Sequence, residues 1–163
     1  MIDIATEAAR LRAAAEAKPM RLPVNRKIDE SHHATTPDGL SVWFTIQVSP
    51  HARIQEAVRS FSKQGCGLIL TTGGTGIGPR DVTPEAIRAT MRVEMPGFGE
   101  VMRAESMKIT PNAILSRNLA AVVDHALVIA LPGKPSGAVE CLGFVQGAVP
   151  HGVALAQETP TSC

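Results

Sequence analysis

One apolar run followed directly by glycines restricts the folds open to this chain more than any other feature. Residues Gly67 to Thr71 are almost entirely apolar, and the glycine-rich segment Thr72 to Gly78 follows at once. An apolar run without polar alternation is typical of a central parallel strand that is covered on both faces. Glycines placed after such a strand let the backbone approach a ligand closely. We therefore expect a strand, a binding loop and then a helix.

A second unit of the same kind occurs later in the chain. The apolar run Ala126 to Leu131 leads into the Pro/Gly-rich loop Pro132 to Gly137, and a helix carrying Ala138, Cys141 and Leu142 is expected after it. In an open α/β sheet, loops at the carboxyl ends of the strands form the ligand crevice. The pattern predicts the α/β class, with both loops contributing to one crevice.

The segments around these units supply the other expected strands and helices. Ser41 to Val48 alternates apolar and polar residues, which predicts a strand with one buried face. Ser49-Pro50 is a helix-start signal, and Thr83-Pro84-Glu85 and Thr110-Pro111 repeat it. The first helix should be marked by the apolar residues Ile54, Val58 and Phe61 and by its end at Gly65. Further along we expect a break at Pro96-Gly97, a helix from Phe98 to Lys108, a strand from Leu119 to Val123, a turn at Asp124-His125 and a helix from Val149 to Gln157.

The first 40 residues differ from the rest in pattern. Ile2 to Lys18 is Ala-rich and predicts a helix that Pro19 ends, and Met20 to Gly39 shows no sustained period and is interpreted as a linker. The pair His32-His33 lies in this linker. A metal site is one interpretation of it, but two solvated histidines without neighbouring Cys or Asp clusters is the favoured one. The chain is divided accordingly into 1–40 and 41–158.

Composition excludes several classes of function. A chain of 163 residues fits one domain, and its net charge of +1 provides no large field for nucleic acid or an anionic membrane. Aromatic residues make up 3%, so base-stacking platforms are not expected. Cys66 and Cys141 are interpreted as small buried residues. An odd number of cysteines without a signal peptide favours the cytoplasm, and no apolar stretch is expected to be long enough to span a bilayer.

The two loops carry the residue types that bind phosphate. Thr72 and Thr75 add hydroxyl donors, and Arg80 and Lys134 add positive charge. Asp81 stands at the end of the first loop, where a carboxylate can hold Mg²⁺ against a triphosphate. The competing interpretation is that each loop is only a tight strand-to-helix turn. We favour binding because both loops combine glycines with polar or charged groups, although neither is a Walker A motif or a GxGxxG motif.

These loops and four later blocks resemble one family. The stretch TTGGTGIGPRDVTPEA, from Thr71 to Ala86, is similar to the signature of the MogA-like molybdenum-cofactor biosynthesis family, which includes the G domains of gephyrin-type proteins. The likeness extends from about Val48 to Glu158. It continues through MPGFGEVMR (Met95 to Arg103), PNAILSR (Pro111 to Arg117), LPGKPSGAVECL (Leu131 to Leu142) and VPHGVAL (Val149 to Leu155).

The resemblance implies a three-layer α/β/α sandwich with a mostly parallel sheet, commonly trimeric, that adenylylates molybdopterin with Mg²⁺ and ATP. A partner enzyme would then insert molybdate. By position, Asp81 would be the catalytic, metal-associated aspartate, and Arg80 would lie in the same loop. The remaining site residues implied for nucleotide and pterin are Thr72, Gly73, Gly74, Thr75, Gly76, Ser116, Arg117, Pro132, Gly133, Lys134, Pro135, Ser136 and Gly137.

Two departures from the family pattern point to an altered or impaired enzyme. The family's first strand, with its Ser-Asp loop, has no match in Met1 to Gly39. The family's Pro-Asp pair before the first helix matches Pro50-His51 here, so a second catalytic aspartate is replaced by histidine. The alternative function is therefore a non-catalytic or truncated molybdopterin-binding or scaffold homologue.

Overall fold

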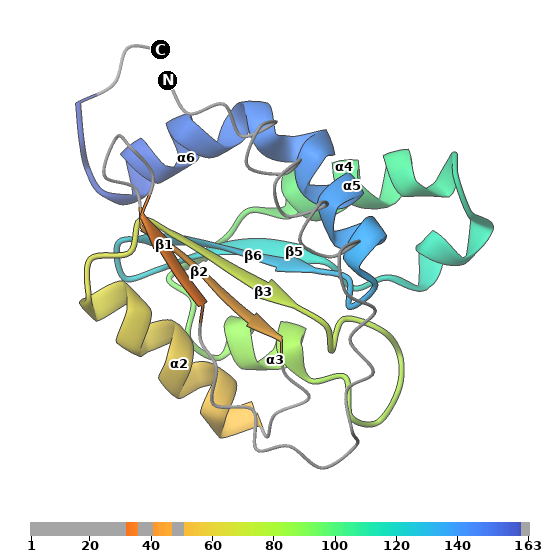
Figure 1. The fold of residues 1–163 in the computed structure, drawn as a ribbon, viewed down its shortest axis with the longest axis horizontal. Coiled ribbons are helices and arrows are strands. Elements are labelled where there is room, and N and C mark those ends of the chain that lie inside the picture. Colours follow the sequence, from red (N-terminus) through yellow and green to blue (C-terminus); the bar gives the residue numbers. More distant parts are fainter. Residues whose placement is uncertain (1–31, 36–40, 47–50, 161–163) are drawn as a thin grey trace.

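A mixed sheet with helices on both faces forms the body of the protein (Figure 1). The computed structural model describes residues 51–160 and, before them, the backbone of two strands at 32–35 and 41–46. The helix expected between Ile2 and Lys18 lies outside the described residues. So does the helix-start signal at Ser49-Pro50.

The described strands are arranged in the order β1-β2-β3-β6-β5-β4. Strand β3 is parallel to both of its neighbours, β2 and β6. Strand β5 is antiparallel to both β6 and β4, so β4 has the same direction as β6. Strand β1 is antiparallel to β2. Most strands therefore share one direction, as expected. The bounds are β1 His32–Thr35, β2 Ser41–Ile46, β3 Leu68–Thr72, β4 Val93–Glu94, β5 Leu119–Val123 and β6 Ala126–Leu131.

Helices cover the two faces of this sheet in separate groups. Helices α2 (His51–Lys63) and α3 (Thr83–Arg88) lie on one face, and α4 (Pro96–Met107), α5 (Pro135–Val145) and α6 (Val149–Ala156) lie on the other (Figure 1). Two 3-10 turns, η1 (Pro111–Leu115) and η2 (Gln146–Ala148), complete the described elements. The architecture is the expected three-layer α/β/α sandwich.

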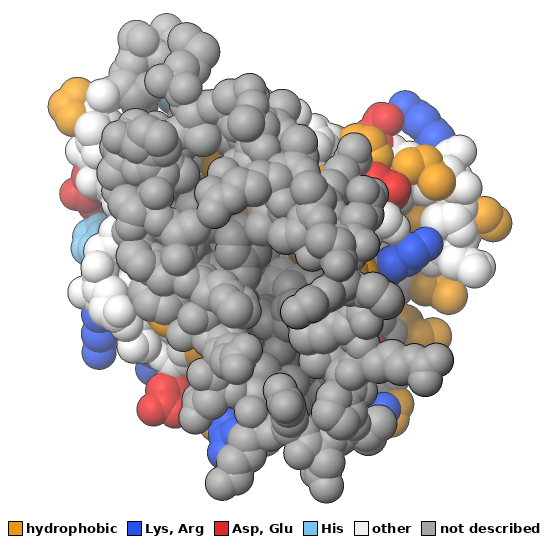
Figure 2. Space-filling view, in the orientation of Figure 1, with side chains coloured by type: hydrophobic (Ala, Val, Ile, Leu, Met, Phe, Trp, Pro, Cys, Tyr) orange, Lys and Arg blue, Asp and Glu red, His pale blue; other side chains and the backbone are white. Residues whose placement is uncertain are grey.

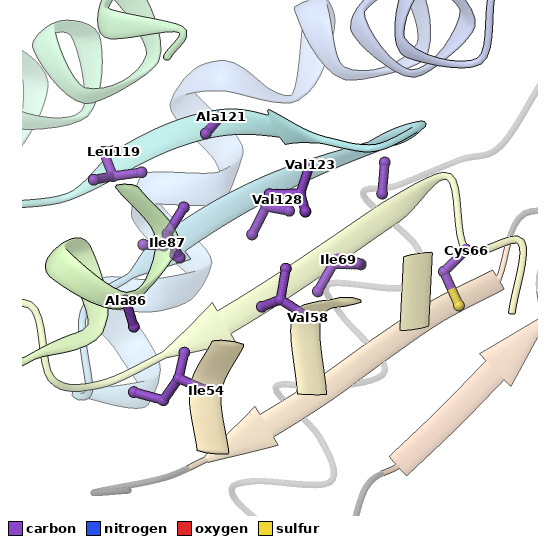
Figure 3. Packing of buried hydrophobic residues seen from close by; sticks show 12 residues of the cluster. Ile54, Val58, Cys66, Ile69, Ala86, Ile87, Leu119, Ala121, Val123 and Val128 are labelled. Atoms are coloured by element: carbon purple, nitrogen blue, oxygen red, sulfur yellow. The ribbon is translucent and has the colours of Figure 1, made fainter. Parts of the chain in front are cut away.

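The apolar strands alternate their side chains between the two layers. In β3, Ile69 packs with α2 and α3, and Leu68 and Leu70 pack on the opposite face. Successive residues of a strand point to opposite faces, so a strand covered on both sides must be apolar throughout. Figure 3 shows the cluster on the α2 and α3 side, where Ile54, Val58, Ile69, Ile87 and Val128 converge. The sequence prediction for β3, β5 and β6 is confirmed.

The end of α2 follows the prediction made from Gly65. Gly65 adopts a φ of +87°, its N–H donates to the Ser62 carbonyl at 3.0 Å, and the Cys66 N–H donates to the Phe61 carbonyl at 3.2 Å. This pair of hydrogen bonds is the Schellman arrangement that closes helices with a left-handed glycine. It turns the chain directly into β3.

Several local predictions are corrected. Strand β1 lies inside the segment interpreted as a linker, so His32 and His33 belong to a strand. The helix that starts at Thr83 ends at Arg88, well before Pro96, and Pro96 begins α4 because proline suits the first turn of a helix. The two-residue strand β4 occupies part of the interval. The Asp124-His125 turn is confirmed, with Asp124 at a φ of +48°.

One described segment is long and apolar enough to cross a membrane, by length and composition only, although no such stretch was expected from the sequence. It runs from Pro135 to Ala156, has a mean hydropathy of 1.2 and contains α5, η2 and α6. Its residues Cys141, Val145, Val149 and Val153 are buried against the sheet. These four residues share one core cluster with residues of β3, β5 and β6.

Candidate functional site

The two glycine loops leave the sheet side by side. Strands β3 and β6 are parallel neighbours whose last residues, Thr72 and Leu131, are partners in the ladder. The Gly73 N–H donates to the Leu131 carbonyl at 3.0 Å, and the Thr72 hydroxyl donates to the Pro132 carbonyl at 2.9 Å. A Cβ on Gly133 would lie 3.2 Å from the Cα of Gly73. The loops therefore touch backbone to backbone, and both contribute to one edge of the sheet.

The first loop is shaped by two glycines and by Thr83. Gly73 and Gly74 have φ values of +92° and +65°, which side-chain-bearing residues rarely adopt. The buried Thr83 hydroxyl donates to the Gly73 carbonyl at 2.9 Å, and the Thr83 N–H donates to the Gly74 carbonyl at 3.1 Å. Thr83, expected as a helix cap, instead ties α3 to the loop.

Asp81 packs against the loop that it ends. Its Oδ2 accepts a hydrogen bond from the Gly78 N–H at 2.9 Å, and the Asp81 N–H donates to the Gly78 carbonyl at 2.9 Å. A Cβ on either Gly76 or Gly78 would lie 2.9 Å from Oδ2. The half-buried carboxylate occupies space that a Cβ on either glycine would share, so a larger residue at either position would require the carboxylate to shift.

Arg117 lies against the outside of the same loop. Its backbone N–H donates to the Thr75 carbonyl at 2.8 Å, and its Nε donates to the Gly76 carbonyl at 2.7 Å. Its Nη2 donates to the Asp81 carbonyl, and its Nη1 forms an ion pair with Glu85 of α3. The guanidinium predicted to complete the ligand pocket is thus bound to protein groups.

A cavity of about 500 Å³ opens between the two loops, α4, η1 and α5. This volume is in the range of small-molecule and cofactor sites. Among the residues predicted from sequence, those that line it are Thr75, Gly76, Ser116, Pro132, Gly133, Lys134, Ser136 and Gly137. Those placed outside its lining are Thr72, Gly73, Gly74, Arg80, Asp81, Arg117 and Pro135. A second cavity beneath α2, about 20 Å³, has room for one water molecule.

Electrostatics favour an anion at the loop side of the cavity. Lys134 is exposed and immediately precedes α5, whose first residue is Pro135. The first N–H groups of a helix carry a partial positive charge, and Ser136 and Gly137 of this first turn line the cavity. Gly133, which precedes Lys134 in the same loop, also lines the cavity. These groups can bind a phosphate without a dedicated pair of basic side chains.

The opposite wall contains residues that the sequence did not identify. The Arg103 Nη1 donates to the Asn118 carbonyl at 2.9 Å, and both residues line the cavity. Asn118 is 3% exposed, and its side-chain Oδ1 has no hydrogen-bond partner within the described part of the chain. The Cys141 Sγ lies 3.6 Å from the Asn118 Nδ2 and 3.5 Å from the Ser106 Oγ. Arg103 and Ser106 come from α4, Asn118 directly precedes β5 and Cys141 comes from α5, so sequence spacing carries no signal for the set.

Cys141 is buried, as expected for a small core residue, and its environment suppresses ionisation. Burial raises the pKa of the Cys141 thiol because the thiolate would lose solvation. Hydrogen bonds from Ser106 and Asn118 oppose this shift, and the charge of Glu140 adds to it. A protonated thiol is a weak nucleophile, so Cys141 contributes to the cavity wall as a neutral group.

The comparisons with known proteins show the family of this chain. Residues 45–151 match the family described as a probable molybdopterin binding domain. The molybdopterin adenylyltransferase of Helicobacter pylori strain J99 is 50% identical over 90 residues, which are 55% of this chain and 51% of that protein. Gephyrin of Dictyostelium discoideum is 43% identical over 109 residues, which are 67% of this chain and 15% of gephyrin.

A solved structure shows the same fold. The molybdopterin biosynthesis enzyme MoaB of Thermus thermophilus superposes with a TM-score of 0.63 at 41% identity, covering 69% of this chain and 72% of that one. The chain spans about half the length of the adenylyltransferases that it matches, 51% for the Helicobacter protein. The family match nevertheless covers both glycine loops and the cavity between them. The chain belongs to the molybdopterin-binding domain family.

Proposed function

We propose that this protein is a molybdopterin adenylyltransferase that transfers AMP from ATP to the terminal phosphate of molybdopterin. The observation that carries the proposal is the meeting of two glycine loops at one wall of a 500 Å³ cavity. The name of the Helicobacter relative, which is half identical over the aligned region, supports the choice of reaction. In the proposed reaction, a phosphate oxygen of the pterin forms a bond to the α-phosphorus of ATP. The bond from that phosphorus to the bridging oxygen breaks, and pyrophosphate leaves.

Such a displacement mainly requires alignment and charge neutralisation. The N–H groups of Gly76 and Gly133 and of the first turn of α5 are suited to phosphate oxygens, and Lys134 adds a positive charge. The deeper wall, with Arg103 and Asn118, offers polar groups for a heterocyclic ring. We assign the loop side of the cavity to phosphates and the wall side to a ring.

Asp81 suits a magnesium site of the kind found with nucleotides. Mg²⁺ is usually held by one or two carboxylates together with substrate phosphates and water. The described residues contain no cluster of three or more His, Cys, Asp or Glu side chains that could hold a metal alone. A single carboxylate beside a phosphate loop fits a Mg²⁺ ion that takes its other ligands from the substrate phosphates and water. Mg²⁺ held there would neutralise negative charge on the phosphate being transferred.

A second function is favoured by one residue. His51, the first residue of α2, stands where the family pattern has an aspartate, and imidazole does not supply the oxygen ligand that Mg²⁺ prefers. A protein that binds molybdopterin without adenylylating it would retain both loops and the cavity. We rank adenylylation first because Asp81 and its loop are complete.

The test is direct. Purified protein is incubated with molybdopterin, ATP and Mg²⁺, and the products are identified by mass spectrometry. Adenylyl-molybdopterin and pyrophosphate should form together. If molybdopterin binds but no adenylylated product appears at any protein concentration, the binding-protein alternative replaces the enzyme.

We also propose that the chain assembles as a homotrimer and passes its product to a molybdate-inserting partner enzyme. Exposed apolar side chains gather over α4 and η1, at the right-hand edge of Figure 2. They include Met107, Ile109, Ile114 and Leu115, which are 44%, 63%, 68% and 50% exposed. Contiguous exposed apolar side chains are typical of protein interaction sites. Ile109 and Leu115 also line the cavity, so a subunit placed here would border the ligand.

A further inference from the structure

Arg117 contacts the glycine loop and α3 through its backbone N–H and through all three nitrogens of its guanidinium. Its backbone N–H and its Nε, Nη1 and Nη2 atoms contact, in order, Thr75, Gly76, Glu85 and Asp81. The guanidinium fork is rigid and planar, so one side chain can hold several acceptors at fixed separations. Arg117 is absent from the lining of the 500 Å³ cavity, whereas its neighbour Ser116 is present.

The two loop residues joined by this guanidinium have different proposed tasks. Gly76 lines the cavity, and Asp81 carries the carboxylate. Between them the loop is packed around Asp81 Oδ2, which accepts from the Gly78 N–H and leaves no room for a Cβ at Gly76 or Gly78. Arg117 adds a direct link between the two backbone positions, because its Nε donates to the Gly76 carbonyl and its Nη2 donates to the Asp81 carbonyl.

We propose that Arg117 is a positioning residue that fixes Asp81 relative to the cavity, with Glu85 as its counter-ion on α3. This inference rests on the proposed function, in which Asp81 holds Mg²⁺ and the loop receives phosphate. Arg117 does not contact the ligand. Its loss removes no side chain from the cavity lining, but it releases the Gly76 and Asp81 carbonyls and displaces the carboxylate from the reacting phosphates.

The first measurement concerns the loop itself and requires no activity. Hydrogen exchange is compared in wild type, Arg117→Lys and Glu85→Gln, with Arg88→Lys as the matched control. Arg88 lies on the same helix as Glu85 and forms an exposed ion pair with Glu94, and lysine keeps its charge. We expect peptides covering 73–81 to exchange faster in Arg117→Lys, because the Gly78 and Asp81 amides are protected by bonds within the loop. Strands β5 and β6 should remain unchanged, as should the loop in Arg88→Lys.

The second measurement separates positioning from ligand contact. A small misplacement of a catalytic group costs ~10²-fold in rate. We expect Arg117→Lys to lower kcat by about that factor and to leave the KM for molybdopterin within about threefold, because no lining side chain is removed. Glu85→Gln should show a smaller fall in kcat, since glutamine retains an acceptor for the Nη1 but not the charge.

Two results would overturn the inference. Unchanged exchange of residues 73–81 in Arg117→Lys would show that Arg117 does not hold the loop. A rise in KM for molybdopterin with kcat unchanged would show that Arg117 binds the ligand directly. If the wild-type protein forms no adenylylated product, the proposed reaction is wrong. The affinity of each variant for molybdopterin is then measured in place of KM. Binding that is retained while loop exchange rises would still support positioning.

Discussion

The hydroxyl of Thr83 donates a hydrogen bond to the carbonyl oxygen of Gly73, 2.9 Å away, and joins the start of α3 to the start of the first glycine loop. The same hydroxyl oxygen would overlap a Cβ placed on Gly74. Gly74 is therefore required twice, for its φ of +65° and for the space beside Thr83. The loop and the helix form one packed unit.

We expect Gly74→Ala to lower the free energy of unfolding by more than ~1 kcal/mol, because it combines a left-handed backbone with a steric clash. The matched control is Gly143→Ala in α5, where a Cβ would meet nothing within 4 Å. That change should raise the free energy of unfolding by ~0.5–1 kcal/mol, because alanine is the better helix former. Urea unfolding of both variants measures the difference. Equal effects would contradict the role given to Gly74.

Asp81→Asn should lower adenylylation by ~10²–10³-fold while the fold is retained, because it removes the charge that would hold Mg²⁺. Asparagine keeps an oxygen that can accept from the Gly78 N–H, so the loop should stay in place. Turnover and circular dichroism are measured together. Unchanged turnover with an unchanged spectrum would remove Asp81 from the mechanism.

His51→Asp should increase product formation, by up to ~10²–10⁴-fold if the missing carboxylate acts as base or metal ligand. Binding of molybdopterin should change little. The first turn of α2 contains no acidic residue, so the new aspartate should also stabilise the helix slightly, by ~0.3–1 kcal/mol. His51→Asn, which has no charge, is the control. If wild type already turns over as fast as His51→Asp, the histidine does not impair the enzyme.

Cys141 should make stability depend on pH in the alkaline range. Its folded pKa is raised above the ordinary value of 9.0, mainly by burial. The unfolded chain therefore ionises first, and the contribution of the thiol is complete below pH 9.0 and is lost as pH rises through the folded pKa. Urea unfolding from about pH 8 to about pH 10.5 should show a steeper loss of stability in wild type than in Cys141→Ala. Parallel curves would show that the thiol titrates equally in both states.

Light scattering at micromolar concentration should give the mass of a homotrimer. Ile114 is 68% exposed and does not line the cavity, so Ile114→Asp is the suitable test of the apolar surface over α4 and η1. Placing a charge in a buried subunit contact is costly, and the variant should dissociate at a higher protein concentration than wild type. A monomeric wild type would contradict the assembly, and a trimeric Ile114→Asp with unchanged affinity would place the contact elsewhere.

The sequence predicted those parts of the fold that are visible in local patterns. The apolar run of β3 identified a strand buried on both faces, and the runs of β5 and β6 identified strands. The rule that loops at the carboxyl ends of the strands form the ligand crevice placed the two loops together. Strand β1 was missed because its four residues gain their structure from pairing with β2, and a pairing partner is not visible in local periodicity. Strand β4 was missed because two residues are too few to show a period.

The sequence predicted which backbone loops form the candidate site, but it predicted few of the side-chain contacts in it. Glycines at 73 and 74 identified the loop because their left-handed conformations depend on the residue type itself. The contact between Ser106 and Cys141 spans 35 residues, and the bond from Arg103 to the Asn118 carbonyl spans 15, so neither has a local signature. Arg117 was expected near the ligand because its charge is visible in the sequence, while the carbonyl groups that bind it are not.

The close approach of Gly73 and Gly133 also sets a rule for redesign. With 3.2 Å between the Gly73 Cα and a Cβ built on Gly133, a side chain at 133 would require the Gly73 backbone to move by a few tenths of an ångström, whereas a Cβ on Gly73 would lie at an ordinary 3.8 Å from the Gly133 Cα. A graft that changes the substrate preference of this scaffold should therefore either keep Gly133 or redesign 72–78 together with 131–137.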